Sequence, residues 1–138
     1  MIDTNVVSEL RKGRRCNPNV AHWFANVRED ELFFSVLTIG EIRLGIDRIQ
    51  RRDATSAASL NKWLNRLIDS FQDRILPVDR PIVEEWGRMN VQRMLPVIDS
   101  LLAATARRHG LSVVTRNVKD IARAGVDYVN PFEVQSSE

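Results

Sequence analysis

The sequence predicts an α/β fold, specifically a three-layer α/β/α sandwich around a central, mainly parallel sheet. Two observations predict it. Short apolar runs typical of buried strands alternate along the chain with longer runs in which apolar residues recur at helical spacing. Strands separated by helices pair in parallel through right-handed crossovers, which place helices on both faces of the sheet. We expect one domain over 1–133 of the 138 residues and a disordered tail over 134–138.

The expected strands are short. The first is very short and ends at Asp3, where the polar triplet Asp-Thr-Asn directly follows the apolar start. Four more strands are expected at 31–37, 74–78, 112–115 and 126–129, which are apolar runs bounded by polar or turn-forming residues. Since the carboxyl ends of parallel strands share one edge of a sheet, residues that follow these strands are candidates for a common site.

Capping residues mark the starts of several expected helices. Asn17 with Pro18 starts one helix, and Asp79 is the expected N-cap of another. Thr38, with Glu41 three residues later, has the spacing of a capping box, which would start a helix after the strand 31–37. The remaining helices are expected over 54–72, from Pro96 to a stop at Gly110, and over 118–124.

Composition excludes several classes of protein. The 20 basic and 18 acidic residues give a net charge of +2, too small to indicate a nucleic-acid partner on its own. Cys16, His22 and His109 stand alone, which argues against a disulfide and against a zinc site. The sequence shows neither an apolar stretch long enough to span a bilayer nor a signal pattern. We therefore expect a cytoplasmic protein without a membrane partner.

Basic residues gather in two segments. One is the run from Arg11 to Arg15, and the other is the broken run of Arg48, Arg51 and Arg52. Such runs are typical of solvated loops and helix faces, and we interpret each of them, taken alone, as surface charge.

Acidic residues recur where the predicted strands end. Asp3 ends the first strand, Glu41 follows the strand 31–37, and Asp120 follows the strand 112–115. Asp99 lies among apolar neighbours near a helix start, where a carboxylate is costly unless it is paired or binds a cation. Each acid alone fits a helix cap or a first helical turn. The set predicts a cluster of carboxylates at one edge of the sheet.

Clustered carboxylates without His or Cys suit Mg²⁺ or Mn²⁺ rather than zinc. A divalent ion at such a site polarises a phosphoryl oxygen and lowers the pKa of a bound water, so phosphodiester hydrolysis is the chemistry that this donor set favours. In this hypothesis Asp3 and Asp99 hold the ion, while Glu41 orients or deprotonates the attacking water.

The chain resembles the PIN-domain superfamily, and within it the VapC/FitB-type toxins of bacterial toxin–antitoxin pairs. The resemblance covers nearly the whole chain through an ordered set of motifs: DTNVVSE at 3–9, TIGEIRLG at 38–45, RILPVD at 74–79, IDSLLAATARRHG at 98–110, TRN at 115–117 and NPF at 130–132. It implies a PIN-like fold and a Mg²⁺- or Mn²⁺-dependent endoribonuclease. Relatives generally have a few more apolar residues before the first triplet, where this chain has Met1 and Ile2.

The resemblance also implies roles for individual residues. Asp3, Glu41 and Asp99 match the first three acidic positions of the family and would bind the metal. The fourth position is open between Asn117, which stands where relatives can carry Asp, and the nearby Asp120. Thr4 and Thr115 would support the cluster through their hydroxyl groups, and Arg116, with Arg11 to Arg15, would contact the RNA backbone.

Partners are implied in the same way. A cognate, VapB-like antitoxin would restrain the toxin by placing a basic residue among the acids. The toxin is expected to be a homodimer, with a higher toxin–antitoxin assembly as an open alternative, and to meet DNA only through the antitoxin. The RNA is expected to be cut in single-stranded loops.

Two alternatives to a toxin nuclease remain. Asn117 and the short start favour a catalytically weak PIN-like module that binds RNA or protein without cutting. A haloacid-dehalogenase-like phosphatase is disfavoured, because no second Asp stands two residues after Asp3 and no matching lysine motif is evident.

Overall fold

A computed structural model describes residues 1–90 and 95–134. The helices are α1 (Thr4–Leu10), α2 (Pro18–Ala25), α3 (Val36–Gln50), α4 (Ala54–Phe71), α5 (Arg80–Met89), α6 (Val97–His109) and α7 (Val118–Arg123). The strands are β1 (Phe34–Ser35), β2 (Ile75–Leu76), β3 (Val113–Val114) and β4 (Tyr128–Val129), and short 3-10 turns cover Gly13–Arg15, Glu29–Glu31 and Gln72–Arg74. Of the expected tail, 135–138 lie outside the described residues, and the domain boundary at 133 stays a prediction.

The first residues of the chain occupy the middle of the sheet. β1 pairs in parallel with β2, and β3 pairs in parallel with β4. Ile2 joins the two pairs, because it forms a parallel bridge with Val114 while its N–H donates to the carbonyl oxygen of Phe33 at 2.9 Å. The order β2, β1, residues 1–3, β3, β4 confirms the mainly parallel sheet and its very short first strand.

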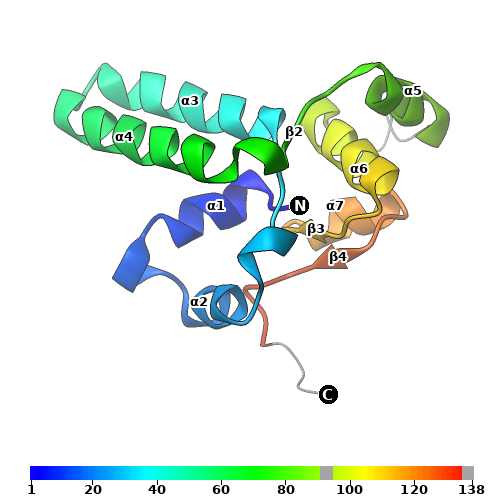
Figure 1. The fold of residues 1–138 in the computed structure, drawn as a ribbon, viewed down its shortest axis with the longest axis horizontal. Coiled ribbons are helices and arrows are strands. Elements are labelled where there is room, and N and C mark those ends of the chain that lie inside the picture. Colours follow the sequence, from blue (N-terminus) through cyan, green and yellow to red (C-terminus); the bar gives the residue numbers. More distant parts are fainter. Residues whose placement is uncertain (91–94, 135–138) are drawn as a thin grey trace.

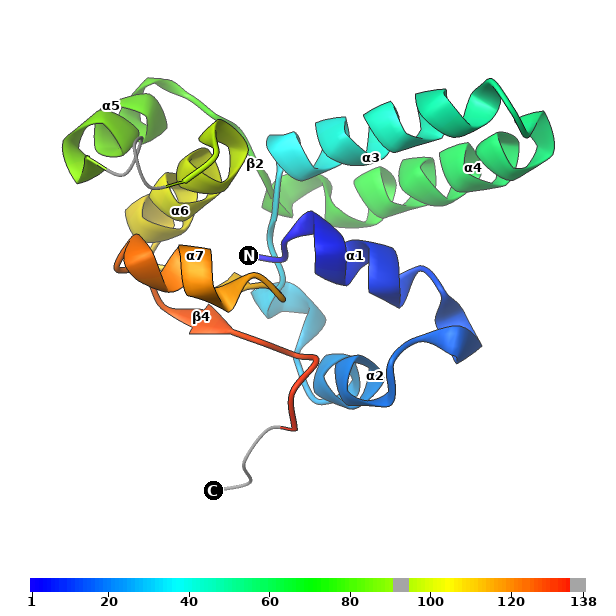
Figure 2. The ribbon, with the colours of Figure 1, turned by 180° about the vertical axis from the view of Figure 1, so that it is seen from behind.

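Alternate residues of the sheet face two separate cores. Met1 and Val113 pack with residues of α6 and α7 on one face, whereas Ile2 and Val114 pack with residues of α1, α2 and α4 on the other. This alternation is the period of two that a strand imposes on its side chains. Helices cover both faces, and the N-terminus lies near the centre of the molecule (Figures 1 and 2), which confirms the three-layer sandwich.

The predicted strand over 31–37 is largely wrong. Glu29–Glu31 forms a 3-10 turn, the strand is confined to Phe34–Ser35, and α3 begins at Val36. Ser35 is the N-cap, since its hydroxyl accepts a hydrogen bond of 3.0 Å from the N–H of Leu37. Thr38 is therefore not a cap but a fully buried residue inside the helix, and the predicted capping box with Glu41 does not form.

The other helix predictions hold to within a few residues. Asn17 and Asp79 cap α2 and α5 through side-chain oxygens that accept backbone N–H groups. α6 ends at Gly110, whose φ of 65° places it in the left-handed region that favours glycine. α3 and α4 pack against each other along Ile46, Ala57 and Leu64 and run side by side away from the sheet (Figure 1).

No helix within the described ranges is both long and apolar enough to cross a membrane.

Candidate active site

Asp3 is fixed by both the sheet and the helix that follows it. Its backbone N–H donates to the carbonyl oxygen of Val114 at 2.9 Å, which continues the ladder begun by Ile2. Its side chain caps α1, with Oδ1 accepting the N–H of Thr4 at 2.8 Å. Asp3 is buried, with an exposed fraction of 7%. The carboxylate thus stands at the end of the central strand, where the sequence places it.

Thr115 connects the carboxylate of Asp3 to the neighbouring strand. Its hydroxyl donates to Oδ2 of Asp3 at 2.9 Å and accepts the N–H of Asn117 at 2.9 Å. Thr115 is fully buried. Since a buried hydroxyl is costly without partners, these bonds hold the end of β3 in register with Asp3.

Glu41 reaches the site from α3. It lies in the second turn of that helix, not in the first turn that the sequence predicts, because the helix begins at Val36. Its Oε1 accepts a hydrogen bond of 2.6 Å from the hydroxyl of Thr4, and its side chain is exposed. Thr4 therefore joins the acid of α3 to the residue that follows Asp3.

The carboxyl of Asp99 lies close enough to three other acids for their charges to act on it. Asp99 lies half-buried in the first turn of α6. Burial raises the pKa of its carboxyl, and the negative charges of Asp3, Glu41 and Asp120 raise it further. Acids from three other segments of the chain thus lie within electrostatic reach of Asp99.

Asn117 and Asp120 are direct neighbours. The side-chain nitrogen of Asn117 donates to Oδ2 of Asp120 at 3.0 Å, and Asp120 lies in the first turn of α7. The charge of Asp120 acts on Asp99. Asn117 thus orients the carboxylate of Asp120, and which of the two fills the fourth position stays a prediction.

Asn5 is a further member of this network and is not among the site residues predicted from the sequence. Its side-chain nitrogen donates to Asp3 Oδ2 at 3.4 Å and to Thr115 Oγ1 at 3.3 Å, while its Oδ1 accepts the backbone N–H of Arg116 at 3.2 Å. Its place in the Asp-Thr-Asn triplet is the signal that could have identified it.

The guanidinium of Arg116 itself lies 4.6 Å from the ring centroid of Phe132, so this exposed arginine packs on the C-terminal segment.

The donor set fits a hard divalent cation. The converging side chains carry carboxylate and hydroxyl oxygens, which Mg²⁺ and Mn²⁺ prefer. The negative charges that raise the pKa of Asp99 are those that a cation would relieve. Within the described part of the chain, no three acidic, His or Cys side chains stand close enough to form a ready ligand set. An ion held by three of these acids would require their carboxylates to lie closer together than they do in this structure.

Comparison with known proteins agrees with this geometry. The toxin FitB of Neisseria gonorrhoeae is 28% identical over 138 residues, covering 96% of this chain and 97% of that protein. A VapC ribonuclease of Sinorhizobium fredii is also 28% identical, with the same coverage. The solved structure of FitAB bound to a DNA fragment matches with a TM-score of 0.88 at 25% identity, covering 99% of this chain and 98% of the other. The PIN domain model matches residues 1–126, so this chain belongs to the PIN domain family.

Proposed function

We propose that the chain is the toxin of a toxin–antitoxin pair and acts as a divalent-metal-dependent endoribonuclease. The observation that carries the proposal is the convergence of the charges of Asp3, Glu41 and Asp120 on the half-buried Asp99. Such a cluster costs free energy in the isolated protein, and this cost is expected where carboxylates serve a cation. The toxin name of one relative and the ribonuclease name of another support the assignment.

The residues divide the work as follows. Asp3 and Asp99, with Asp120 beside them, would hold Mg²⁺ or Mn²⁺, and the ion would supply Lewis-acid activation of the phosphoryl oxygen and of the attacking water. Glu41 would orient the attacking water and accept its proton. Thr4 holds the Glu41 carboxylate through its 2.6 Å bond, and Thr115 holds that of Asp3 through its 2.9 Å bond. Both hydroxyls thereby fix the direction of the acids toward the substrate.

The partners follow from the activity. A cell that makes a ribonuclease of this kind must restrain it, so we propose a cognate, VapB-like antitoxin that satisfies the acids with a basic side chain. The toxin works in the cytoplasm as a homodimer and meets DNA through the antitoxin. The similarity to FitAB bound to DNA supports this arrangement.

Cleavage of RNA by the purified chain, free of antitoxin, tests the function. Structured RNA is incubated with Mg²⁺ or Mn²⁺, with EDTA, and with the Asp99→Asn variant. Asp69→Asn, which neutralises an exposed acid on α4, is the matched control. We expect wild type and Asp69→Asn to cut in either metal, and EDTA or Asp99→Asn to abolish cutting. Cleavage that survives both EDTA and Asp99→Asn would contradict the proposal, and RNA binding without any cleavage would favour the non-cutting module.

A further inference from the structure

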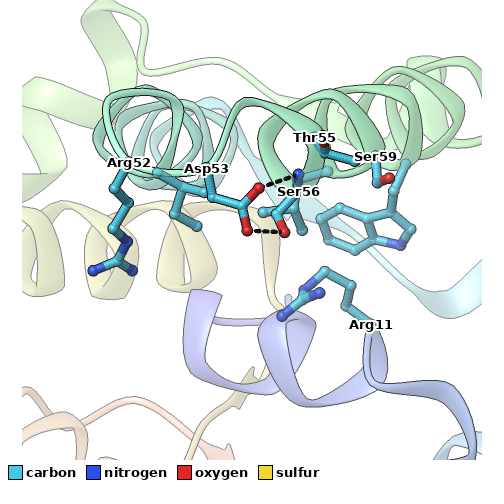
Figure 3. A pocket seen from close by; sticks show the side chains of 9 residues that line it. Arg11, Arg52, Asp53, Thr55, Ser56 and Ser59 are labelled. Atoms are coloured by element: carbon cyan, nitrogen blue, oxygen red, sulfur yellow. Dashed lines mark hydrogen bonds between the residues drawn. The ribbon is translucent and has the colours of Figure 1, made fainter.

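The two basic segments of the sequence meet at one pocket. Arg11, at the C-cap of α1, and Arg52, in the turn between α3 and α4, both line a cavity of about 560 Å³. Thr55, Ser56 and Ser59 of α4 line the same cavity with hydroxyl groups. The two arginines are 41 positions apart in the chain (52 − 11), and packing of α1 beneath the α3–α4 pair brings them together (Figure 3).

Both guanidinium groups are available to a ligand. Arg11 and Arg52 are exposed. Arg51 lies 4.0 Å from Asp47, whereas no acid in the described part of the chain forms an ion pair with Arg11 or Arg52. Guanidinium groups bind phosphate oxygens through two parallel hydrogen bonds, so two of them at one cavity are suited to a phosphate.

The one acid of the pocket is already engaged. Asp53 caps α4, with Oδ1 accepting the N–H of Ser56 at 3.0 Å and Oδ2 accepting its hydroxyl at 2.6 Å. Figure 3 shows this pair of bonds, with Arg52 and Arg11 on either side. These hydrogen bonds and, to a smaller extent, the positive charge of Arg52 lower the pKa of Asp53. The two arginines and the Asp53 carboxylate together give the pocket one excess positive charge.

A second hollow lies between the pocket and the acidic site and shares lining residues with the pocket. It has a volume of about 170 Å³ and is lined by Thr4 and Glu41 at the candidate active site. Arg11, Leu60 and Trp63 line both hollows, so the two hollows adjoin each other. A strand that lies along both hollows would pass the partly buried Trp63 between Glu41 and the two arginines, and an indole ring is a group on which bases stack.

We propose that Arg11 and Arg52 hold a backbone phosphate of the RNA away from the bond that is cut, and so align the strand across the acids. This inference rests on the proposed function, since it identifies a substrate subsite of the same site. RNA suits the two adjoining hollows better than an acidic peptide, because its phosphates recur along the strand and can engage the arginines at one end while the strand reaches the acidic site at the other. Such phosphate contacts give affinity and alignment without sequence choice.

Binding of a fluorescent single-stranded RNA to Arg11→Gln and Arg52→Gln tests the inference. Anisotropy is measured in Mg²⁺ on an Asp99→Asn background, with an RNA of roughly 12 nucleotides, within the length that single-strand grooves cover. Arg108→Gln, an exposed arginine at the far end of α6, is the charge-matched control. We expect Arg11→Gln and Arg52→Gln each to bind the RNA about fivefold to tenfold more weakly than the background protein. The slope of log K against log salt is negative, and its magnitude should decrease by about 0.7 for each arginine removed. Arg108→Gln should change neither the affinity nor this slope.

A substitution that should strengthen RNA binding distinguishes a direct effect of charge from a loss of binding caused by misfolding. Asp53→Asn keeps a good N-cap residue while removing the negative charge of the pocket, so it should tighten RNA binding. Unchanged affinity and an unchanged salt slope in both arginine variants would overturn the inference, and a carboxylate-bearing peptide would then be the expected ligand of the pocket. Failure of the wild-type protein to bind RNA would also overturn the inference. Failure of the proposed function looks different: wild type then fails to cleave, while the arginine-dependent binding remains.

Discussion

The hydroxyl of Thr115 donates a hydrogen bond of 2.9 Å to Oδ2 of Asp3, a residue 112 positions earlier in the chain. The same hydroxyl accepts the N–H of Asn117, and both Thr115 and Asp3 are buried. The bond crosses the sheet between the central strand and β3. The first and last thirds of the chain must therefore fold together before the acidic cluster exists.

Thr115→Val removes this donor at nearly constant volume. Oδ2 of the buried Asp3 and the N–H of the half-buried Asn117 each lose a hydrogen-bond partner, so the free energy of unfolding should fall by about 1–3 kcal/mol. Thr115→Ser, which keeps the hydroxyl, should lose less. Urea denaturation measures both values, and a Val variant as stable as the Ser variant would show that the bond does not matter.

Asp99→Asn should make the metal-free protein more stable at neutral pH while abolishing cleavage. Burial and the neighbouring acids raise the pKa of Asp99, so the folded state binds its proton more tightly than the unfolded chain does. Wild-type stability therefore falls as pH rises from about 4 through the raised pKa, and the Asn variant lacks this loss.

Thermal unfolding on both sides of this pH window measures the effect. The stability advantage of the Asp99→Asn variant over wild type should increase as pH rises. Mg²⁺ at neutral pH should stabilise wild type more than the variant, since only wild type has the full set of acids. A gain that is the same at acidic and neutral pH would exclude the titration of Asp99 as its cause.

Thr4→Val tests whether the orientation of Glu41 matters for the reaction. Glu41 is exposed, so loss of its 2.6 Å bond should change stability by less than about 0.5 kcal/mol. The kcat for RNA cleavage should fall roughly tenfold, with KM nearly unchanged, because Glu41 acts on the attacking water rather than on RNA binding. Thr4→Ser is the control that should keep wild-type kcat. An equal fall in both variants would mean that the bond has no role.

Asn117→Asp examines the fourth acidic position. In the wild-type protein the side chain of Asn117 donates a hydrogen bond of 3.0 Å to the carboxylate of Asp120. The substitution replaces this hydrogen bond by contact between like charges. The midpoint of thermal unfolding should fall without metal and recover in Mg²⁺ or Mn²⁺, whereas Asn117→Ala should show the fall without the recovery. Recovery in both variants would place the ion away from this pair.

Local patterns predict the helices of this fold well and its strand ends poorly. The spacing of Leu60, Leu64 and Phe71 identifies α4, because packing of one apolar face suffices to define a helix. The run over 31–37 contains only a two-residue strand, since Ser35 caps α3 three residues earlier than Thr38 would. An apolar run does not distinguish a buried strand from a buried helix start.

The acidic site is predictable in outline because it follows a topological rule. The ends of parallel strands share one edge, which is enough to bring both Asp3 and Asp120 within electrostatic reach of Asp99. The pocket of Arg11 and Arg52 follows no such rule, because it depends on how α1 packs beneath the α3–α4 pair. Each basic segment alone has the pattern of solvated charge, and only the tertiary structure combines them.

Anomalous diffraction from crystals of the wild-type protein grown with Mn²⁺ tests the central claim, that acids from separate segments bind one divalent ion. The claim predicts an anomalous peak within about 2.0–2.4 Å of carboxylate oxygens of Asp3 and Asp99, which is absent from Asp99→Asn crystals. A fully occupied Mn²⁺ bound elsewhere, with the carboxylates of Asp3 and Asp99 unchanged, would contradict it.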